Sequence, residues 1–300
     1  MSNELASALQ RLANYRIRNC RASQDIFESG VVVFRNHALH KFGEDSWAFL
    51  EQLALASIDV GRLDIAEQCL LQLSEQFPGS PRVQCVEGIY KEATENPETA
   101  LGYYTKLLEE DPANVAAWKR QTSVLRRMGK IDRAVEELSQ FLDTFYTDVE
   151  GWLELADIYA SCNQYNFALQ SLSHVLLLAP QNPFYVLQAA ETAYTAGDIC
   201  LAIKMFLIVI DMTVEDDDAR IKNSTPTGIT VRAWYGVELS AKRLQKEPNL
   251  MSHSPSHTLA PENLPLIAAL AKDVLRTAYR SDTGSQSQTK QELSRWLAAK

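Results

Sequence analysis

The sequence predicts an all-α fold, a solenoid of antiparallel helix pairs that stack into a curved superhelix. Three observations predict it: alanine recurs at one fixed spacing, other positions repeat at the same spacing, and the apolar residues fall at helical intervals. The alanines lie 34 residues apart and mark five units: Ala66, Ala100, Ala134, Ala168 and Ala202.

Other positions share this 34-residue period. Four residues after each alanine stands a large apolar residue, and Trp118 and Trp152 also lie one period apart. Twelve residues after the alanine, three of the five residues are proline: Pro78, Pro112 and Pro180. Five residues before it stand residues that mostly tolerate a left-handed turn: Gly61, Glu95, Gly129, Asn163 and Gly197. The agreement between these positions indicates a true repeat.

The repeat pattern is clearest in residues 152–180, "WLELADIYASCNQYNFALQSLSHVLLLAP". This pattern resembles the tetratricopeptide (TPR) repeat, and the matching residues are Trp152, Leu155, Ala156, Tyr159, Ala168 and Pro180. Small residues at 156 and 168 let two helices pack closely, and Pro180 ends the second helix. Single pairs cannot bury their apolar faces alone, so we expect the stack to be the folding unit.

The rest of the chain is divided around this array. We expect N-terminal capping helices at 1–45, five TPR repeats at 46–214, an acidic loop at 215–228, a divergent C-terminal helix pair at 229–281 with an internal linker at 246–265, and a tail at 282–300. Helices are expected at 3–20 and 24–42 within the first segment, and the tail has at most a short helix at 291–300. The apolar face of the first helix is interpreted as a cap over the first repeat; the alternative is a free partner-binding stripe.

Composition excludes several classes of function. The chain has 300 residues and a net charge of -9, which argues against nucleic acid as the main partner. No apolar run is long enough to span a bilayer, and the N-terminus lacks the apolar core of a signal peptide, so we expect a cytosolic protein. Five dispersed cysteines are typical of reduced thiols.

No catalytic, metal or cofactor site is predicted. The glycine-rich nucleotide-binding motifs, the zinc-protease motif and the serine-hydrolase motif do not occur. His37 and His40 form one close pair and His253 and His257 another, but neither pair has a third ligand nearby. The sequence therefore favours a binding function.

A TPR stack offers a concave groove lined by the first helix of each pair. The residues predicted to line it as a partner-binding groove are Lys119, Ser123, Arg126, Arg127, Leu153, Asp157, Phe184, Leu187, Glu191 and Tyr194. The stretch 119–133 is the most basic in this acidic chain, with Asp132 its one acidic residue. Two interpretations remain open: a solvated charged face, or a docking patch for an acidic partner segment.

One known TPR chemistry is not supported. Chaperone-binding TPR proteins hold a terminal carboxylate with a set of lysine, asparagine and arginine residues. Lys119 occupies one of these positions, but the others hold Ser123, Glu154, Phe184 and Gln188.

Three stretches carry a more specific resemblance. Residues 56–83, 107–120 and 149–159, with "QFPGS-x-RV" and "EDP-x-N" the most distinctive motifs, resemble the TPR subunit (subunit 2) of the endoplasmic-reticulum (ER) membrane protein complex. The resemblance runs from about residue 30 to 205. It implies a non-catalytic cytosolic scaffold, peripheral on the cytosolic face of the ER membrane, with membrane-embedded and cytosolic subunits of the complex as partners. The family's complex inserts tail-anchored and multi-pass proteins, and its TPR subunit holds cytosolic segments of the membrane-embedded subunits.

An alternative from another class remains open at this point. A free cytosolic TPR adaptor that links a chaperone or an enzyme to its clients would show the same repeats. An enzyme is a distant third interpretation.

Overall fold

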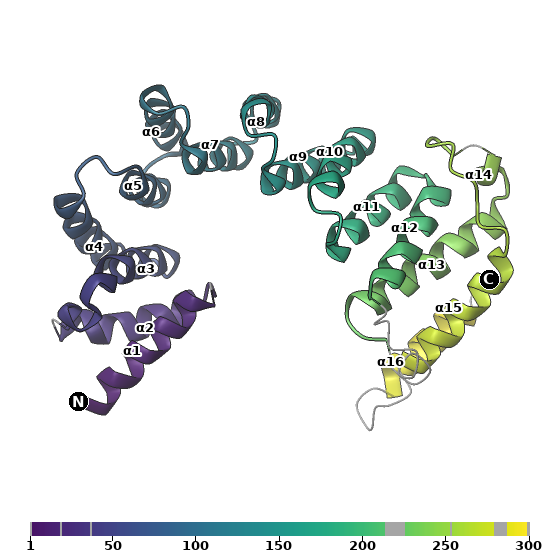
Figure 1. The fold of residues 1–300 in the computed structure, drawn as a ribbon, viewed down its shortest axis with the longest axis horizontal. Helices are drawn as coiled ribbons and strands as arrows, with labels where there is room; N and C mark the ends of the chain where they lie inside the picture. Colours follow the sequence, from purple (N-terminus) through teal and green to yellow (C-terminus); the bar gives the residue numbers. More distant parts are fainter. Residues whose placement is uncertain are drawn as a thin grey trace. The chain divides into compact units, whose positions relative to one another are not determined.

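The computed structural model describes residues 2–18, 20–36, 38–213, 226–252, 254–278 and 287–298, and every regular element in those ranges is a helix (Figure 1). The chain divides into two compact units, residues 1–138 and 139–300. The first unit holds α1 (Ser2–Ile17), α2 (Ser23–Arg35), a 3₁₀ helix η1 (Leu39–Asp45), α3 (Ser46–Asp59), α4 (Leu63–Gln76), α5 (Pro81–Thr94), α6 (Pro97–Glu110) and α7 (Val115–Arg127). The unit boundary falls within α8 (Ile131–Thr144).

The second unit continues the helix pairs and ends in a less regular part. Its helices are α9 (Val149–Ser161), α10 (Tyr165–Leu178), α11 (Pro183–Ala196), α12 (Ile199–Thr213), α13 (Ile229–Lys246), α14 (Asn249–Ser252), α15 (Leu264–Ala278) and α16 (Ser287–Ala298). The helical repeat fold predicted from the sequence is confirmed.

The periodic alanines occupy one position in the structure. Each is the fourth residue of the second helix of its pair, in α4, α6, α8, α10 and α12, and each is 0% exposed. A side chain of one carbon lets the two helices of a pair approach closely at this point. The helices end two residues before Pro78, Pro112 and Pro180, which lie exposed in the turns, because proline disfavours helical backbone in the residue before it.

The turns inside the pairs use left-handed backbone at four of the five predicted positions. Gly61, Gly129, Asn163 and Gly197 have φ between 60° and 91°. Glu95 is the exception among these residues, and its backbone is extended with φ -113°. The next residues, Asn96 and Pro97, start α6 directly, and the Asn96 side chain accepts a hydrogen bond from the backbone N–H of Thr99 at 2.9 Å.

The two periodic tryptophans also make one repeated interaction. The indole N–H of Trp118 donates to the carbonyl of Pro112 at 3.0 Å, and that of Trp152 donates to the carbonyl of Tyr146 at 2.9 Å. Each bond joins the first turn of a helix to the loop that precedes it. Trp152 also stacks on His174, with ring centroids 4.2 Å apart.

The N-terminal helices pack into the core of the first unit. Ala8 and Leu12 of α1 are 0% and 1% exposed and share a cluster with residues of α2, α3 and α4. The helix expected at 24–42 is shorter in the structure. It ends at Arg35, where the side chain of Asn36 turns back and donates to the carbonyl of Val32 at 2.6 Å.

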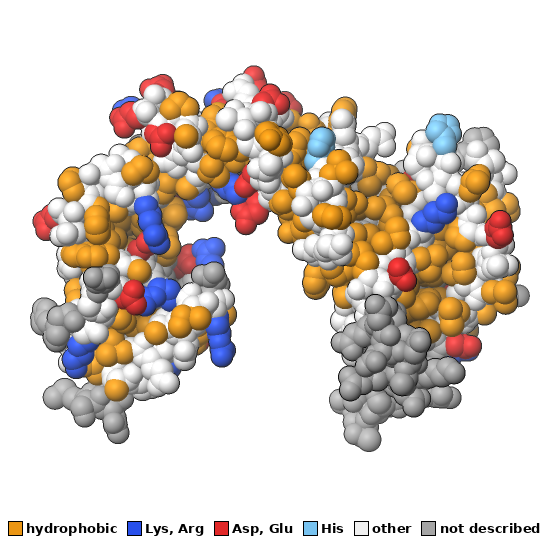
Figure 2. All heavy atoms as spheres, in the orientation of Figure 1, with side chains coloured by type: hydrophobic (Ala, Val, Ile, Leu, Met, Phe, Trp, Pro, Cys, Tyr) orange, Lys and Arg blue, Asp and Glu red, His pale blue; other side chains and the backbone are white. Residues whose placement is uncertain are grey.

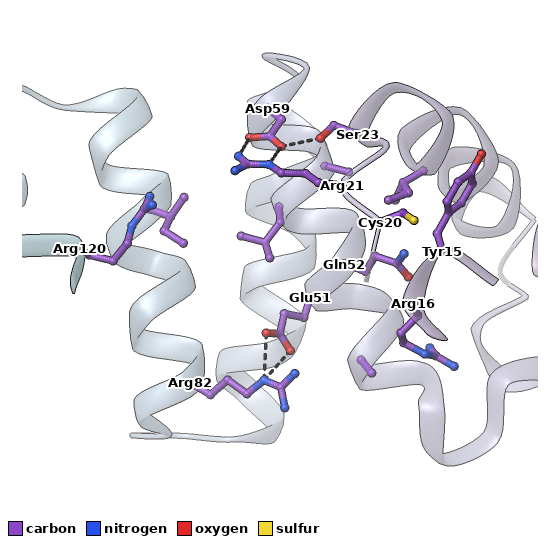
Figure 3. Close-up of a pocket in the computed structure, with 15 residues that line it drawn as sticks. Tyr15, Arg16, Cys20, Arg21, Ser23, Glu51, Gln52, Asp59, Arg82 and Arg120 are labelled. Atoms are coloured by element: carbon purple, nitrogen blue, oxygen red, sulfur yellow. Dashed lines mark hydrogen bonds and ion pairs between the residues drawn. The ribbon is translucent and has the colours of Figure 1, made fainter. Parts of the chain in front are cut away.

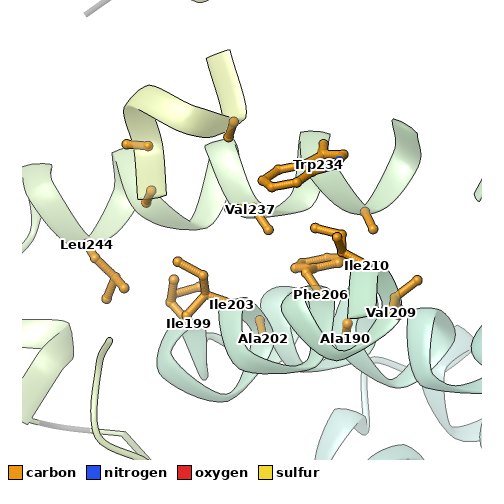
Figure 4. Packing of buried hydrophobic residues seen from close by; sticks show 14 of the residues in the cluster. Ala190, Ile199, Ala202, Ile203, Phe206, Val209, Ile210, Trp234, Val237 and Leu244 are labelled. Atoms are coloured by element: carbon orange, nitrogen blue, oxygen red, sulfur yellow. The ribbon is translucent and has the colours of Figure 1, made fainter. Parts of the chain in front are cut away.

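The core of the second unit is built largely from α11, α12, α13 and α15 (Figure 4). Gly236 of α13 faces Phe206 of α12 so closely that a Cβ atom at 236 would lie 2.4 Å from the ring. Ile203, Phe206 and Val237 meet in this interface and are nearly fully buried. The glycine therefore sets the distance between α12 and the C-terminal helices.

The C-terminal residues contain more structure than the sequence suggested. The tail was expected to carry at most a short helix at 291–300, but α16 runs from Ser287 to Ala298. Leu293 and Leu297 are buried in the core of the second unit, and Lys242 donates to the carbonyl of Trp296 at 3.0 Å. Most of the acidic loop expected at 215–228 lies outside the described residues, since 214–225 are not described.

Candidate partner-binding surfaces

A pocket of about 460 Å³ lies on the first helices of successive pairs in the first unit (Figure 3). Its walls come from the end of α1, the segment before α2, the first turn of α2, and from α3, α5 and α7. Leu55 and Ile89 contribute apolar surface, and the polar lining includes Tyr15, Arg16, Arg21, Glu51, Gln52, Asp59, Arg82 and Arg120. This is the side of the repeats that the pattern assigns to the groove.

Two ion pairs within the pocket show the same arrangement. Arg21 Nη2 lies 2.7 Å from Asp59 Oδ1, and Arg82 Nε lies 2.8 Å from Glu51 Oε2. The arginine side chains are 82% and 75% exposed, whereas their carboxylate partners are 27% and 21% exposed. The hydrogen bond from Arg21, helped by one from Ser23, holds the pKa of Asp59 below its usual value. The pocket therefore presents guanidinium groups to solvent and keeps the carboxylates beneath them.

Gln52 adds a buried acceptor to this lining. Its side-chain oxygen Oε1 is buried and has no hydrogen-bond donor among the described residues. A buried amide oxygen without a hydrogen-bond donor costs free energy, so Gln52 is a locally unfavourable part of this lining.

Glu92 of α5 organises the neighbouring part of this surface. Its side chain is 7% exposed and lies 3.0 Å from Arg120 Nε and 3.5 Å from Arg127 Nη1, both on α7. The hydroxyl of Tyr104 on α6 donates to the same carboxylate at 2.8 Å. Burial, together with the nearby Glu92 charge, raises the pKa of Tyr104, so this hydroxyl stays protonated and remains a donor.

The basic stretch 119–133 is therefore less isolated than its sequence suggests. Asp132 is the one acidic residue inside the stretch, yet Glu92 pairs with Arg120 and Arg127 from the preceding first helix. Arg133 also lies 3.6 Å from Glu137. Glu92 was not predicted because it lies 28 residues before Arg120 in the sequence. An alignment of the first helices of consecutive repeats could have placed the two residues together.

The predicted groove residues of the first unit all lie on α7. Ser123 and Arg127 are exposed, and Lys119 and Arg126 are half-buried. The structure brings these four together on one helix, next to the pocket residue Arg120.

The predicted groove residues of the second unit lie on α9 and α11. Leu153 is half-buried and Asp157 exposed on α9, and Phe184 of α11 is 64% exposed. The prediction is wrong for Leu187, which is 5% exposed within the core of this unit. Leu187 lies on the same broad face of α11 as Phe184, but it stands at the edge of that face where the helix packs, in the core cluster with Val186 and Ala190.

Glu191 and Tyr194 line a second hollow, of about 230 Å³, between α11 and α13. Arg232 of α13 donates through Nη2 to Glu191 Oε2 at 2.8 Å, and Arg243 lies 5.5 Å from the ring centre of Tyr194. Arg232 and Tyr235 also line this hollow. They are not among the predicted groove residues, because α13 stands outside the regular period. Figure 2 shows hydrophobic side chains exposed over the helices of this unit.

Two other features are absent from the described ranges. No three His, Cys, Asp or Glu side chains in them gather closely enough to hold a metal ion. None of the helices in them has the length and apolar composition needed to cross a membrane.

The repeats match a known family. The model of the EMC2 TPR-like repeat domain matches residues 77–203, from the turn before α5 to the first part of α12. Residues 77–203 are thus similar to the EMC2 TPR-like repeat domain. They include the first helices α7, α9 and α11, on which all the predicted groove residues lie.

Curated relatives show the same similarity. ER membrane protein complex subunit 2-A of Xenopus laevis is 39% identical over 189 residues, which are 63% of this chain and 63% of the relative. The TPR repeat protein oca3 of Schizosaccharomyces pombe is 35% identical over 145 residues, 48% of this chain and 51% of the relative. The matches thus span less than two thirds of the length of these relatives. The resemblance predicted from the sequence is confirmed.

A solved structure supports the fold alone. The C-terminal part of a TPR repeat-containing protein from Cytophaga hutchinsonii superposes with a TM-score of 0.55 and 13% identity, covering 88% of this chain and 98% of the other. At this identity the similarity concerns architecture and not function.

Proposed function

We propose that this chain is a non-catalytic scaffold subunit of an ER membrane protein insertase complex, held on the cytosolic face of the ER membrane by its partner subunits. The match of residues 77–203 to the model of the EMC2 TPR-like repeat domain is the observation that carries the proposal. Its partners are the membrane-embedded and cytosolic subunits of the complex, whose cytosolic segments occupy the groove. The membrane-spanning partners supply insertion of tail-anchored and multi-pass proteins, and this chain holds them in place.

The chemistry of the first unit supports a partner segment of acidic character. Arg21 and Arg82 are the outer members of their ion pairs, so an incoming carboxylate meets guanidinium groups first. The exposed Arg127 and Ser123 extend this surface along α7. Electrostatic matching of this kind contributes mainly to specificity and to the rate of association.

The second unit offers a more apolar contact. Phe184 is 64% exposed on α11, and a hollow with two tyrosines and the Glu191–Arg232 pair lies farther along the same helix. We include Leu153, Asp157, Phe184, Glu191 and Tyr194 in this proposed contact and leave out the buried Leu187.

Affinity purification of the tagged chain from gently solubilised membranes tests the proposal. A stoichiometric set of multi-span ER proteins is the expected result. Recovery only from the cytosolic fraction, alone or with chaperones, would replace the scaffold with a free TPR adaptor.

A charge reversal tests the proposed acidic partner. Arg82→Glu should lower the yield of the co-purifying subunits, because Arg82 is 75% exposed at the pocket. The matched control is Arg276→Glu on α15, which is 61% exposed and lies outside both surfaces. Equal yields from the two variants would contradict the acidic-segment assignment while leaving the scaffold function standing.

A further inference from the structure

A buried carboxylate holds the segment that follows α14. Asp198 is 3% exposed at the start of α12. Ser254 Oγ donates to its Oδ1 at 2.8 Å, and the backbone N–H of Ser256 donates to its Oδ2 at 2.9 Å. Asp198 also accepts from the backbone N–H of Leu201 at 3.2 Å, so one side chain both caps α12 and fixes the linker.

The rest of the segment has few other attachments to the core. Pro255, Ser256 and His257 are exposed, and residues 254–263 form turns and irregular backbone without a helix. The hydroxyl of Ser254 accepts from the backbone N–H of Thr258 at 3.2 Å, so its remaining bonds stay within the segment. Segments with little buried apolar surface open locally at much lower cost than the whole fold unfolds. An enzyme that needs an extended substrate can therefore reach Ser254.

We propose that Ser254, which is followed by Pro255, is a phosphorylation site for an ATP-dependent, proline-directed protein kinase, and that its phosphorylation releases the segment 254–258 from Asp198. In the step, Ser254 Oγ forms a bond to the γ-phosphorus of ATP and the bond from that phosphorus to the β–γ bridging oxygen breaks. ADP leaves with the bonding electrons, and the hydroxyl proton passes to the base of the kinase.

The release follows from charge. The hydroxyl hydrogen that binds Asp198 is lost, and a group carrying close to two negative charges takes its place beside a buried carboxylate. Burial tends to raise the pKa of Asp198, but the hydrogen bonds from Ser256 and Ser254 outweigh it and hold that pKa below its usual value. The two groups are then both anions within hydrogen-bonding distance, where like charges repel strongly.

A cysteine near this segment reports the release. Cys200 is 0% exposed, and its thiol lies 3.7 Å from the carbonyl oxygen of Leu250 on α14. Leu250 and Met251 pack against the core of the second unit immediately before the Asp198-bound segment. When the segment is released, α14 loses its C-terminal anchor and the Cys200 thiol becomes accessible.

The first experiment asks whether the site is used. The full chain is incubated with a purified proline-directed kinase and Mg-ATP, and the phosphorylated residues are located by mass spectrometry. We expect phosphate on Ser254. Two other hydroxyl-bearing residues precede a proline, Ser80 and Thr225, and serve as internal comparisons. Phosphate on these alone, or on no residue, overturns the proposal.

The second experiment asks whether the charge opens the segment. Maleimide labelling of Cys200, followed by peptide mapping, is compared for the unmodified chain, the phosphorylated chain and Ser254→Asp. We expect labelling to be faster by about tenfold or more, because a hydrogen bond to a charged group is lost. The buried Cys69 of the first unit should not change, and an unchanged Cys200 rate in the phosphorylated chain overturns the release.

Two further variants test whether faster labelling of Cys200 comes from charge repulsion at Asp198 or from general unfolding. Leu259→Asp places the same charge five residues away on a side chain that is 77% exposed, and its Cys200 rate should match the parent. Adding Asp198→Asn to Ser254→Asp should restore part of the protection, since the repulsion is then removed. Equal acceleration in Ser254→Asp and Leu259→Asp contradicts the proposed mechanism.

Discussion

The hydroxyl of Tyr104 donates a hydrogen bond of 2.8 Å to the carboxylate of Glu92, which joins the two helices of one repeat. Tyr104 is 0% exposed, and Glu92 also pairs with Arg120 of the next repeat at 3.0 Å. One buried carboxylate thus connects α5, α6 and α7. A buried polar group of this kind stabilises the fold only while its partners are in place.

Removing the hydroxyl should therefore weaken the first unit. We expect Tyr104→Phe to lower the free energy of unfolding by about 1–2 kcal/mol, because the Glu92 carboxylate loses a buried donor. Urea unfolding followed by circular dichroism measures the change. The control is Tyr90→Phe, a half-buried tyrosine on α5 outside this network, which should stay within about 0.5 kcal/mol. Equal effects of the two substitutions would show that the Tyr104–Glu92 bond contributes nothing.

Enlarging a periodic alanine should destabilise the second unit. Ala168 is 0% exposed where α9 and α10 pack, so Ala168→Leu inserts three carbons into filled space and should cost about 1–3 kcal/mol. The matched control is Ala269→Leu on the exposed face of α15, which should change stability by about 0.5 kcal/mol or less. A thermal melt of Ala168→Leu that overlays the parent would contradict the packing role of this position.

The residues that recur in every repeat could be predicted from the sequence. The contacts between one repeat and the next could not. Ala168 and its equivalents repeat because every helix pair has the same close-packed point, so one period identifies them all. The Glu92–Arg120 pair occurs once, between neighbouring repeats, and leaves no periodic signal. Leu187 illustrates a second limit, because a groove position and a core position differ by a fraction of one helical turn. The docking of α16 depends on packing against α13, which local sequence does not encode.

Glu238 should give the second unit a distinctive pH dependence. This side chain is 0% exposed, with the amines of Lys242 and Lys272 each 3.6 Å from its Oε1. Burial raises the pKa of Glu238, and this effect outweighs the opposing influence of the two lysines. A carboxyl whose folded pKa is raised binds its proton more tightly in the folded state. Its contribution to stability is therefore full below the unfolded pKa and is lost as the pH rises through the folded pKa.

The variant Glu238→Gln removes this contribution. We expect Glu238→Gln to gain stability relative to the parent as the pH rises from about 4 to 7, because the parent must then bury an anion. Urea unfolding at several pH values measures the difference, and Glu262→Gln, an exposed glutamate before α15, is the control. A difference between Glu238→Gln and the parent that does not vary with pH would show that Glu238 keeps its ordinary pKa in the folded chain.

The five cysteines should separate into two reactivity classes. Cys20 and Cys162 are exposed, so a thiol reagent such as Ellman's reagent should label them first. Cys69 is 0% exposed, and burial raises its pKa to about 12, so almost none of it is thiolate at neutral pH. Cys85 and Cys200 are also buried and should join Cys69 in the slow class. In urea all five thiols should react at one similar rate. This reaction is the control that the reagent is active and that five free thiols are present. Labelling of Cys69 in the folded chain as fast as that of Cys20 would mean that the packing of α4 against α3 opens far more readily than its burial implies.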